Sequence, residues 1–197
     1  NNQVILFLNR RGYGNFVSCT KCGYVFSCKN CDISLTYHKY KNIGTCHYCG
    51  YEENIPKTCP ECGSDYVKPF GIGTEKVEEE VKKLFKNAKV LRMDKDTTSK
   101  KGELDKILNK FKNKEANVLI GTQMLSKGLD FEDVTLVGIL SADMMLNFPD
   151  FRSFETTFQL ITQVSGRAGR SHKEGKVVLQ TYDTDHYVIR RSLNYDF

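Results

Sequence analysis

The chain contains no tryptophan and no apolar run near the roughly 18–20 residues that span a bilayer. It shows no signal-peptide pattern at its start, so we expect a cytoplasmic protein without a membrane partner. It lacks a GxxxxGK[ST] phosphate loop, since the Gly175–Lys176 pair is followed by Val177, and it lacks a DExH motif. These absences argue against a nucleotide-hydrolysing site of the phosphate-loop type made by this sequence alone.

Net charge identifies no partner. The formal charge is +5 with all eight cysteines counted as neutral thiols. Eight thiolates holding two Zn²⁺ ions would bring it to roughly +1, which is weak support for a nucleic-acid-binding protein. Hydrophobic residues make up 40% of the chain and aromatic residues 11%, enough to build a core, so the chain is not disordered.

The eight cysteines are grouped in CxxC pairs, which are Cys19/Cys22, Cys28/Cys31, Cys46/Cys49 and Cys59/Cys62. A two-residue gap lets both sulfurs of a pair face one ion, and two pairs complete a tetrahedral site. Disulfides would need an oxidising compartment, and a redox CxxC is usually single, so two structural Zn(Cys)₄ sites are favoured. Loop-closure cost varies too slowly with length to decide which pairs share an ion.

The cysteine segment, residues 15–70, is rich in phenylalanine and tyrosine. With zinc-bound thiolates its charge is roughly −3, so it offers no basic patch for DNA. We expect most of its aromatic side chains to pack a small core held together by zinc. A protein-contact surface or a base-stacking surface stays open as an alternative.

The remainder of the chain alternates apolar strands with amphipathic helices. Strands are predicted at 3–8, 89–93, 117–122, 134–140 and 176–181, and helices at 75–86, around 104–111, from Ser153 and at 185–193. This alternation predicts an α/β fold with a parallel sheet covered by helices on both faces. The cysteine segment is then an excursion between the first strand and the first helix.

Three loops carry side chains suited to phosphates. They are NRRGYGNF (9–16), which offers Asn9 and Arg10, GTQMLSKGLDF (121–131) and QVSGRAGR (163–170). Because ligands of parallel sheets bind beyond the carboxyl ends of the strands, we expect all three loops at that edge. Small polar groups and free N–H donors there suit a phosphodiester backbone.

These loops resemble the carboxyl-terminal lobe of superfamily 2 helicases, with GTQMLSKGLDF similar to motif V and QVSGRAGR to motif VI. NRRGYGNF, the cysteine spacing, GIGTEKVEEEV and the run from Ala142 to Arg170 narrow the resemblance to replication-restart DNA helicases of that superfamily. The resemblance covers essentially the whole chain. It implies that residues 1–14 and 69–197 form a second RecA-like lobe, with residues 15–68 an inserted two-zinc module.

In that family two RecA-like lobes clamp ATP and Mg²⁺, and the first lobe carries the phosphate loop. The resemblance implies that Arg167 and Arg170 reach the γ-phosphate, with Arg170 as the arginine finger. It also implies that Gln163 positions the nucleotide and that Gly128 and Asp130 face the nucleotide cleft. A placed guanidinium stabilises the charge spread over the transferring phosphoryl group. Since the first lobe is missing and the sequence starts at Asn1, we expect a piece of a longer protein, inactive alone as an ATPase.

The resemblance further implies that Thr122 and Gln123 contact the phosphates of the tracked DNA strand, with Asn9 and Arg10 as weaker DNA-binding candidates. The resemblance also implies a nested pairing, in which the first and last CxxC pairs share one zinc and the two middle pairs share the other. One zinc would be held by Cys19, Cys22, Cys59 and Cys62, and the other by Cys28, Cys31, Cys46 and Cys49.

The function implied is ATP-dependent 3′-to-5′ DNA unwinding for replication restart and primosome assembly. Partners would be forked or single-stranded DNA, single-stranded DNA-binding protein, other primosome proteins and the first RecA-like lobe. Alternatives are another zinc-bearing helicase or translocase of superfamily 2, or a non-catalytic zinc scaffold.

Overall fold

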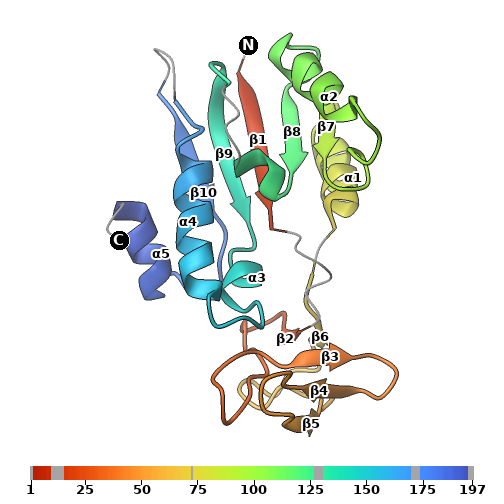
Figure 1. The fold of residues 1–197 in the computed structure, drawn as a ribbon, viewed down its shortest axis with the longest axis vertical. Coiled ribbons are helices and arrows are strands. Elements are labelled where there is room, and N and C mark those ends of the chain that lie inside the picture. The colour runs from red at the N-terminus through yellow and green to blue at the C-terminus, as the bar shows by residue number, and fades with distance from the viewer. Residues whose placement is uncertain (1, 10–15, 72, 127–130, 170–173, 195–197) are drawn as a thin grey trace.

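The computed structural model describes residues 2–9, 16–71, 73–126, 131–169 and 174–194, and these form an α/β fold around a parallel sheet (Figure 1). The sheet has five strands in the order β10-β9-β1-β8-β7, and each neighbouring pair is parallel. The strands are β1 (Gln3–Leu8), β7 (Val90–Met93), β8 (Val118–Gly121), β9 (Val134–Leu140) and β10 (Lys176–Leu179). The predicted strands are therefore confirmed, with ends shifted by at most two residues.

Helices cover both faces of the sheet, as the alternating pattern predicts. They are α1 (Thr74–Leu84), α2 (Glu103–Lys112), the 3-10 helix η1 (Gln123–Ser126), α3 (Asp143–Leu146), α4 (Ser153–Ser165) and α5 (Tyr187–Asn194). Successive side chains of a strand point to opposite faces. Ile5 and Phe7 of β1 accordingly join one buried cluster with residues of α2, α4 and α5, whereas Leu8 joins a second cluster with residues of α1 and α3. Among the described residues, no helix has the length and apolar character to cross a membrane.

Residues 16–70, here called the cysteine module, lie between β1 and α1. The module has an antiparallel pair, β2 (Val17–Cys19) with β6 (Val67–Pro69), and an antiparallel sheet of β3 (Thr36–His38), β4 (Ile43–Thr45) and β5 (Glu52–Asn54). At its base the rings of Phe16 and Phe70 stack with centroids 5.1 Å apart, and Phe70 N donates to Phe16 O. Phe26 and Leu35 belong to a core of its own.

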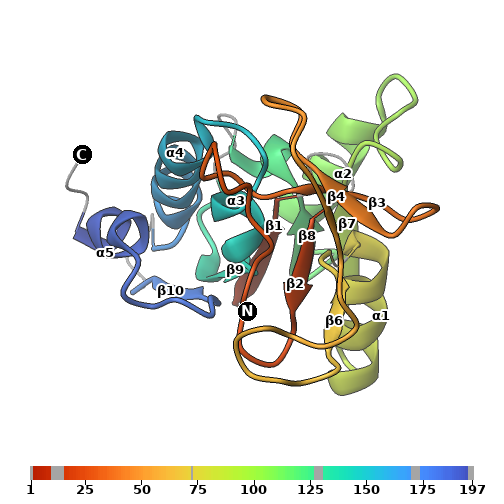
Figure 2. The same ribbon diagram turned by 90° about the horizontal axis from the view of Figure 1, so that it is seen from below.

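The cysteine module lies beyond the carboxyl ends of the central strands (Figures 1 and 2). Ser34 Oγ donates a hydrogen bond of 2.5 Å to the carbonyl oxygen of Asn147, just after α3. On the other side, Tyr182 Oη donates a hydrogen bond of 2.9 Å to Thr20 O. A cavity of about 480 Å³ lies between the module and the sheet. Its lining includes Phe70 of the module and Tyr182 after β10. The module is therefore attached to the sheet at two separate places.

Candidate metal centres and nucleic-acid edge

All four CxxC pairs form the same turn. The N–H of each first cysteine bonds to the carbonyl five residues later, in Cys19–Tyr24, Cys28–Ile33, Cys46–Tyr51 and Cys59–Ser64, at 2.7–2.8 Å. Its carbonyl accepts the N–H of the residue four positions later, which has a positive φ in every case, namely Gly23, Asp32, Gly50 and Gly63. The glycines after three pairs were visible in the sequence. Asp32 adopts the same conformation because short polar side chains tolerate it better than other residues.

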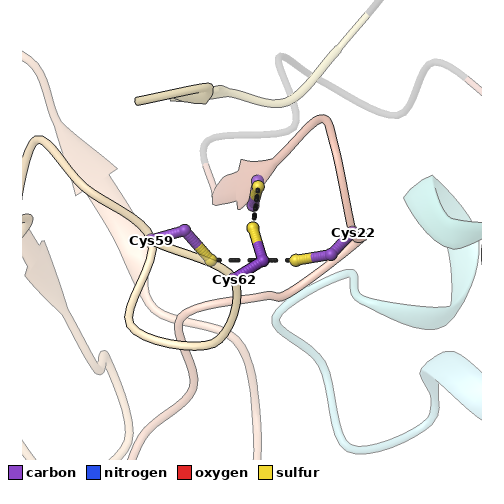
Figure 3. Close-up of side chains that lie close together, drawn as sticks. Cys22, Cys59 and Cys62 are labelled. Atoms are coloured by element: carbon purple, nitrogen blue, oxygen red, sulfur yellow. Dashed lines mark hydrogen bonds between the residues drawn. The ribbon is translucent and has the colours of Figure 1, made fainter. Parts of the chain in front are cut away.

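The structure brings the cysteines together in two groups of four, Cys19/Cys22/Cys59/Cys62 and Cys28/Cys31/Cys46/Cys49, with the sulfurs of each group within 4.8 Å of one another. Figure 3 shows Cys22, Cys59 and Cys62 of the first group pointing toward one another. This is the nested arrangement implied by the family resemblance. Within each group, sulfurs that belong to different CxxC pairs approach to 3.5–3.7 Å, as in Cys19–Cys62, Cys22–Cys59 and Cys28–Cys49.

These distances fit zinc. Four sulfurs placed tetrahedrally around Zn²⁺ at about 2.3 Å lie roughly 3.8 Å apart from one another. The donor set is four thiols with no carboxylate or imidazole, which is the composition of a closed structural site. Bound zinc would supply cross-linking of the module and no open position for a substrate.

Polar neighbours favour the thiolate form of some cysteines in each group, whereas burial and neighbouring thiols raise the pKa of Cys22, Cys28 and Cys31. The Ser64 hydroxyl lies 3.2 Å from Cys19 Sγ and 3.1 Å from Cys62 Sγ. Its hydrogen bond lowers the pKa of Cys19 to about 6 and also lowers the pKa of Cys62. In the second group, the backbone N–H of Tyr51 lowers the pKa of Cys49 to about 6. Since the thiolate is the metal ligand, each group has sulfurs prepared for a cation near neutral pH.

The nucleic-acid candidates lie at the carboxyl edge of the sheet. Gln123 Nε2 donates a hydrogen bond of 2.9 Å to Asn9 Oδ1, so the structure joins the loops that follow β1 and β8. Asn9 and Thr122 are buried, and Gln123 is half-buried. Arg10 lies outside the described residues. Next to this pair is an open depression of about 790 Å³, lined by Lys95, Asp96, Thr98, Ser99, Thr122, Gln123 and Met124.

Asp94 holds one wall of this depression, and our sequence reasoning missed it. It follows β7 and is 2% exposed. One carboxylate oxygen accepts the N–H groups of Asp96 and Thr97, and the other accepts Thr74 Oγ1 at 2.6 Å. The loop sequence DKDTTS carried the signal, because aspartate and threonine commonly bond to backbone groups two or three residues away.

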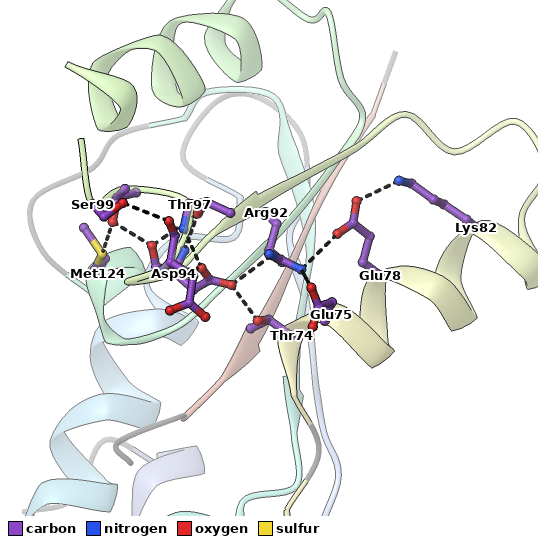
Figure 4. A network of polar contacts seen from close by, with 11 residues as sticks. Thr74, Glu75, Glu78, Lys82, Arg92, Asp94, Thr97, Ser99 and Met124 are labelled. Carbon is purple, nitrogen blue, oxygen red and sulfur yellow. Dashed lines mark hydrogen bonds and ion pairs between the residues drawn. The ribbon is translucent and has the colours of Figure 1, made fainter. Parts of the chain in front are cut away.

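Arg92 completes this network (Figure 4). Its guanidinium lies 2.9 Å from Asp94 and within 3.5 Å of carboxylates of Glu75 and Glu78 on α1. Burial raises the pKa of Asp94, but the hydrogen bonds from Thr74 and Thr97 and the charge of Arg92 outweigh it and lower that pKa overall. The carboxylate therefore fixes both the first turn of α1 and the loop after β7.

Residues 163–169 of QVSGRAGR lie at the opposite edge of the sheet, so our expectation of a carboxyl-edge location was wrong for them. The segment begins in α4, and Gly169 N donates a hydrogen bond of 3.1 Å to the carbonyl of Val134, the first residue of β9. The physical reason is that α4 returns antiparallel to the strands, which carries its end back to their amino ends. Gln163 is exposed and Arg167 half-buried. Arg170, Gly128 and Asp130 lie outside the described residues.

Helix α4 reaches both candidate surfaces. Ser153, Thr156 and Thr157 of its first turns line a small cavity with Asn9 and Gln123. The helix is 13 residues long, roughly 20 Å, and its last turn contains the first residues of the QVSGRAGR segment. The two surfaces are thus joined by one rigid element.

Comparison with known families and proteins supports this picture. Residues 70–172 match the helicase conserved C-terminal domain family, and residues 28–53 match the PriA DNA helicase Cys-rich region domain. Two solved structures align with the chain at low similarity. One is the Pyrococcus furiosus Hef helicase domain, with 18% identity and a TM-score of 0.38 over 91% of this chain and 21% of that one. The other is the C-terminal domain of the DEAD-box protein Dbp5, with 20% identity and a TM-score of 0.43 over 61% of this chain and 63% of that one.

Curated relatives are much more similar. The replication restart protein PriA of Bacillus subtilis is 57% identical over 99% of this chain, and that of Synechocystis is 52% identical over 95%. The matches occupy 24% and 23% of those relatives, so the chain spans about a quarter of their length. The resemblance to replication-restart helicases is confirmed. The chain belongs to the helicase conserved C-terminal domain family and carries a cysteine-rich region of the PriA type between its first strand and its first helix.

Proposed function

We propose that this chain supplies the second RecA-like lobe (residues 1–14 and 69–197) and the inserted two-zinc module (residues 15–68) of an ATP-dependent 3′-to-5′ DNA helicase for replication restart. Two lines support the proposal. Relatives named replication restart protein PriA match 95–99% of the chain. The chain also has motif V-like and motif VI-like loops without a phosphate loop, which a first lobe would provide.

The nucleotide side of the proposed site is the end of α4. Arg167 and Gln163 would face ATP held by the phosphate loop of the first lobe, together with Arg170, Gly128 and Asp130. Phosphoryl transfer spreads negative charge over the γ-phosphate oxygens, and arginines stabilise it. Mg²⁺ would arrive with ATP and be bound mainly by the first lobe.

The DNA side is the depression at the carboxyl edge of the sheet. Thr122 and Gln123 line it, and the Lys95 ammonium beside them can meet phosphate oxygens of a single strand. Asn9 would act through Gln123, because its side chain is buried and bonded to that residue. The network of Asp94 holds the opposite wall in place.

The observation that carries the proposal is that α4 touches both surfaces. Its first turns line the cavity at Asn9 and Gln123, and its last turn leads into Arg167. A change in the contact between the arginines and ATP would displace a rigid helix whose other end supports the DNA side. This gives a direct mechanical route from hydrolysis to movement along a strand.

The cysteine module would hold its shape through two structural zinc ions and provide surfaces for strand separation and for partners. We propose forked or single-stranded DNA, single-stranded DNA-binding protein and other primosome proteins as those partners. Its negative charge with zinc bound, roughly −3, suits protein contact better than a grip on DNA.

ATP hydrolysis provides the test. The 197-residue chain alone should show no DNA-stimulated hydrolysis, whereas the full-length protein that joins it to a phosphate-loop lobe should hydrolyse ATP and unwind forked DNA. Turnover by the chain alone would overturn the division of the site between two lobes. Stimulation by RNA rather than DNA would overturn the substrate assignment.

A further inference from the structure

The loop between α3 and α4, residues 147–152, presents an aromatic ring to solvent. Phe151 is 71% exposed, and the guanidinium carbon of Arg152 lies 5.3 Å from the centroid of its ring. A single exposed phenylalanine is common on protein surfaces and carries no inference by itself. Here the ring is combined with a cation, a defined loop and a position next to the proposed DNA contacts.

Short-range hydrogen bonds hold the loop in one conformation. Asp150 N donates to Phe148 O at 2.7 Å, and Asp150 Oδ1 accepts Arg152 N at 2.8 Å. Ser153 N, at the start of α4, donates to Asp150 O at 3.0 Å. Phe151 lies within this bonded turn, so little backbone freedom would be lost if a ligand stacked on its ring.

The loop is also fixed from two sides. At its start, Asn147 O accepts the hydrogen bond from Ser34 of the cysteine module, and Asn147 Nδ2 donates to Asp143 O. In its middle, Phe148 and Asp150 line the cavity that also contains Asn9 and Gln123. Figure 1 shows the loop after α3 at the carboxyl edge of the sheet, facing the module. Phe151 therefore belongs to a segment that contacts both the cysteine module and the cavity beside the proposed phosphate contacts.

We propose that Phe151 and Arg152 form a stacking site for one base of the single-stranded DNA whose phosphates meet Gln123. Every nucleobase offers a flat π face, and proteins that bind single strands pair aromatic side chains with cations along the backbone. The phenyl ring takes the base. The Arg152 side chain is 64% exposed, with Nε 3.8 Å from Asp150 Oδ1, and its guanidinium reaches the adjacent phosphate. This inference rests on the proposed DNA-binding function and adds a base contact to it.

The test measures the affinity of the full-length protein for fluorescein-labelled oligothymidylate by anisotropy. The variants are Phe151→Ala, Phe151→Tyr and the control Phe85→Ala. Phe85 is an exposed phenylalanine after α1, beyond the opposite edge of the sheet. Phe151→Ala should weaken binding about 10-fold, and Phe151→Tyr and Phe85→Ala should bind like the unchanged protein.

A second set of oligonucleotides separates stacking from other roles. With abasic sites along the strand there is no base to stack, so the unchanged protein and Phe151→Ala should bind equally. An equal loss on normal and abasic DNA, or no loss on either, would overturn the stacking site. In the latter case the exposed ring would be assigned to a protein contact. If the unchanged protein bound no single strand, the proposed DNA-binding function itself would fail. That result differs from normal binding that is insensitive to Phe151→Ala, which would overturn the stacking site alone.

Discussion

The side chain of Tyr182 lies directly against the α-carbon of Gly23, so that a Cβ added at Gly23 would be 2.7 Å from Tyr182 Cβ. The Tyr182 hydroxyl also bonds to Thr20 O. Gly23 belongs to the turn of the first CxxC pair, and Tyr182 follows β10. One tyrosine therefore joins the first cysteine group to the parallel sheet, and the glycine is required both by its φ of +83° and by this close approach.

Replacing Gly23 should destabilise the protein more than replacing the equivalent glycines. Gly50 and Gly63 have φ values of +75° and +68° but no neighbour within 4 Å, so alanine at either should cost about 1–2 kcal/mol from backbone strain alone. Gly23→Ala adds the overlap with Tyr182 and should exceed that cost. Urea denaturation of the zinc-loaded protein measures the difference. In the Gly23→Ala background, Tyr182→Gly removes the Cβ at 2.7 Å together with the ring and should restore part of the stability, whereas a purely additive effect would contradict the contact.

Ser64 should matter for metal retention in the first cysteine group only. Its hydroxyl contacts the sulfurs of both Cys19 and Cys62, and loss of such a partner typically weakens metal affinity by about 10–100-fold. In Ser64→Ala, a chelator should remove one zinc more easily and leave the second unchanged. Competition with a chromogenic chelator, followed by zinc counting, measures this. Ser99→Ala, in the loop after β7 and outside the cysteine module, serves as the control for metal retention, and equal release of both ions would contradict the assignment.

The strands and helices of the sheet could be predicted because each carries its own hydrophobic period. The observed bounds of β9 and the first residue of α4 equal the predicted ones. The short helix α3 and the three-residue strands of the module could not be predicted, because a segment of three or four residues is too short to display a hydrophobic period. The edge at which QVSGRAGR lies depends on the direction of α4, which no local pattern records. The hydrogen bond of the buried Asn9 to Gln123 could not be predicted either, because it joins residues 114 positions apart.

Asp94→Asn should make stability less dependent on pH in acid. The folded-state pKa of Asp94 lies below its ordinary value of about 4, so between those two values the unfolded chain binds more protons. The carboxylate's contribution is therefore present above about pH 4 and is lost as the pH falls through the folded-state pKa. At pH 7 the substitution should cost about 1–3 kcal/mol, since it weakens the bonds to Thr74 and Arg92.

Denaturation curves at pH 7, 5 and 3 measure this effect as the difference between Asp94→Asn and the unchanged protein. That difference should shrink toward pH 3. Asp105→Asn, at an exposed position of α2, should follow the unchanged protein at every pH and controls for acid-induced loss of zinc. A difference that stays constant with pH would show that the Asp94 charge plays no part.

Arg170→Ala should abolish ATP hydrolysis in the full-length protein while leaving single-stranded DNA binding nearly intact. An arginine that stabilises the transferring phosphoryl group typically contributes about 10³–10⁵ in rate, and DNA is proposed to bind at the other end of α4. Arg190→Ala, an exposed arginine on α5, is the matched control and should retain full activity. Steady-state hydrolysis with saturating DNA and anisotropy on the same preparations give the two readouts. Hydrolysis that survives in Arg170→Ala would remove the finger assignment, and parallel loss of DNA binding would show that QVSGRAGR supports the strand-binding edge instead.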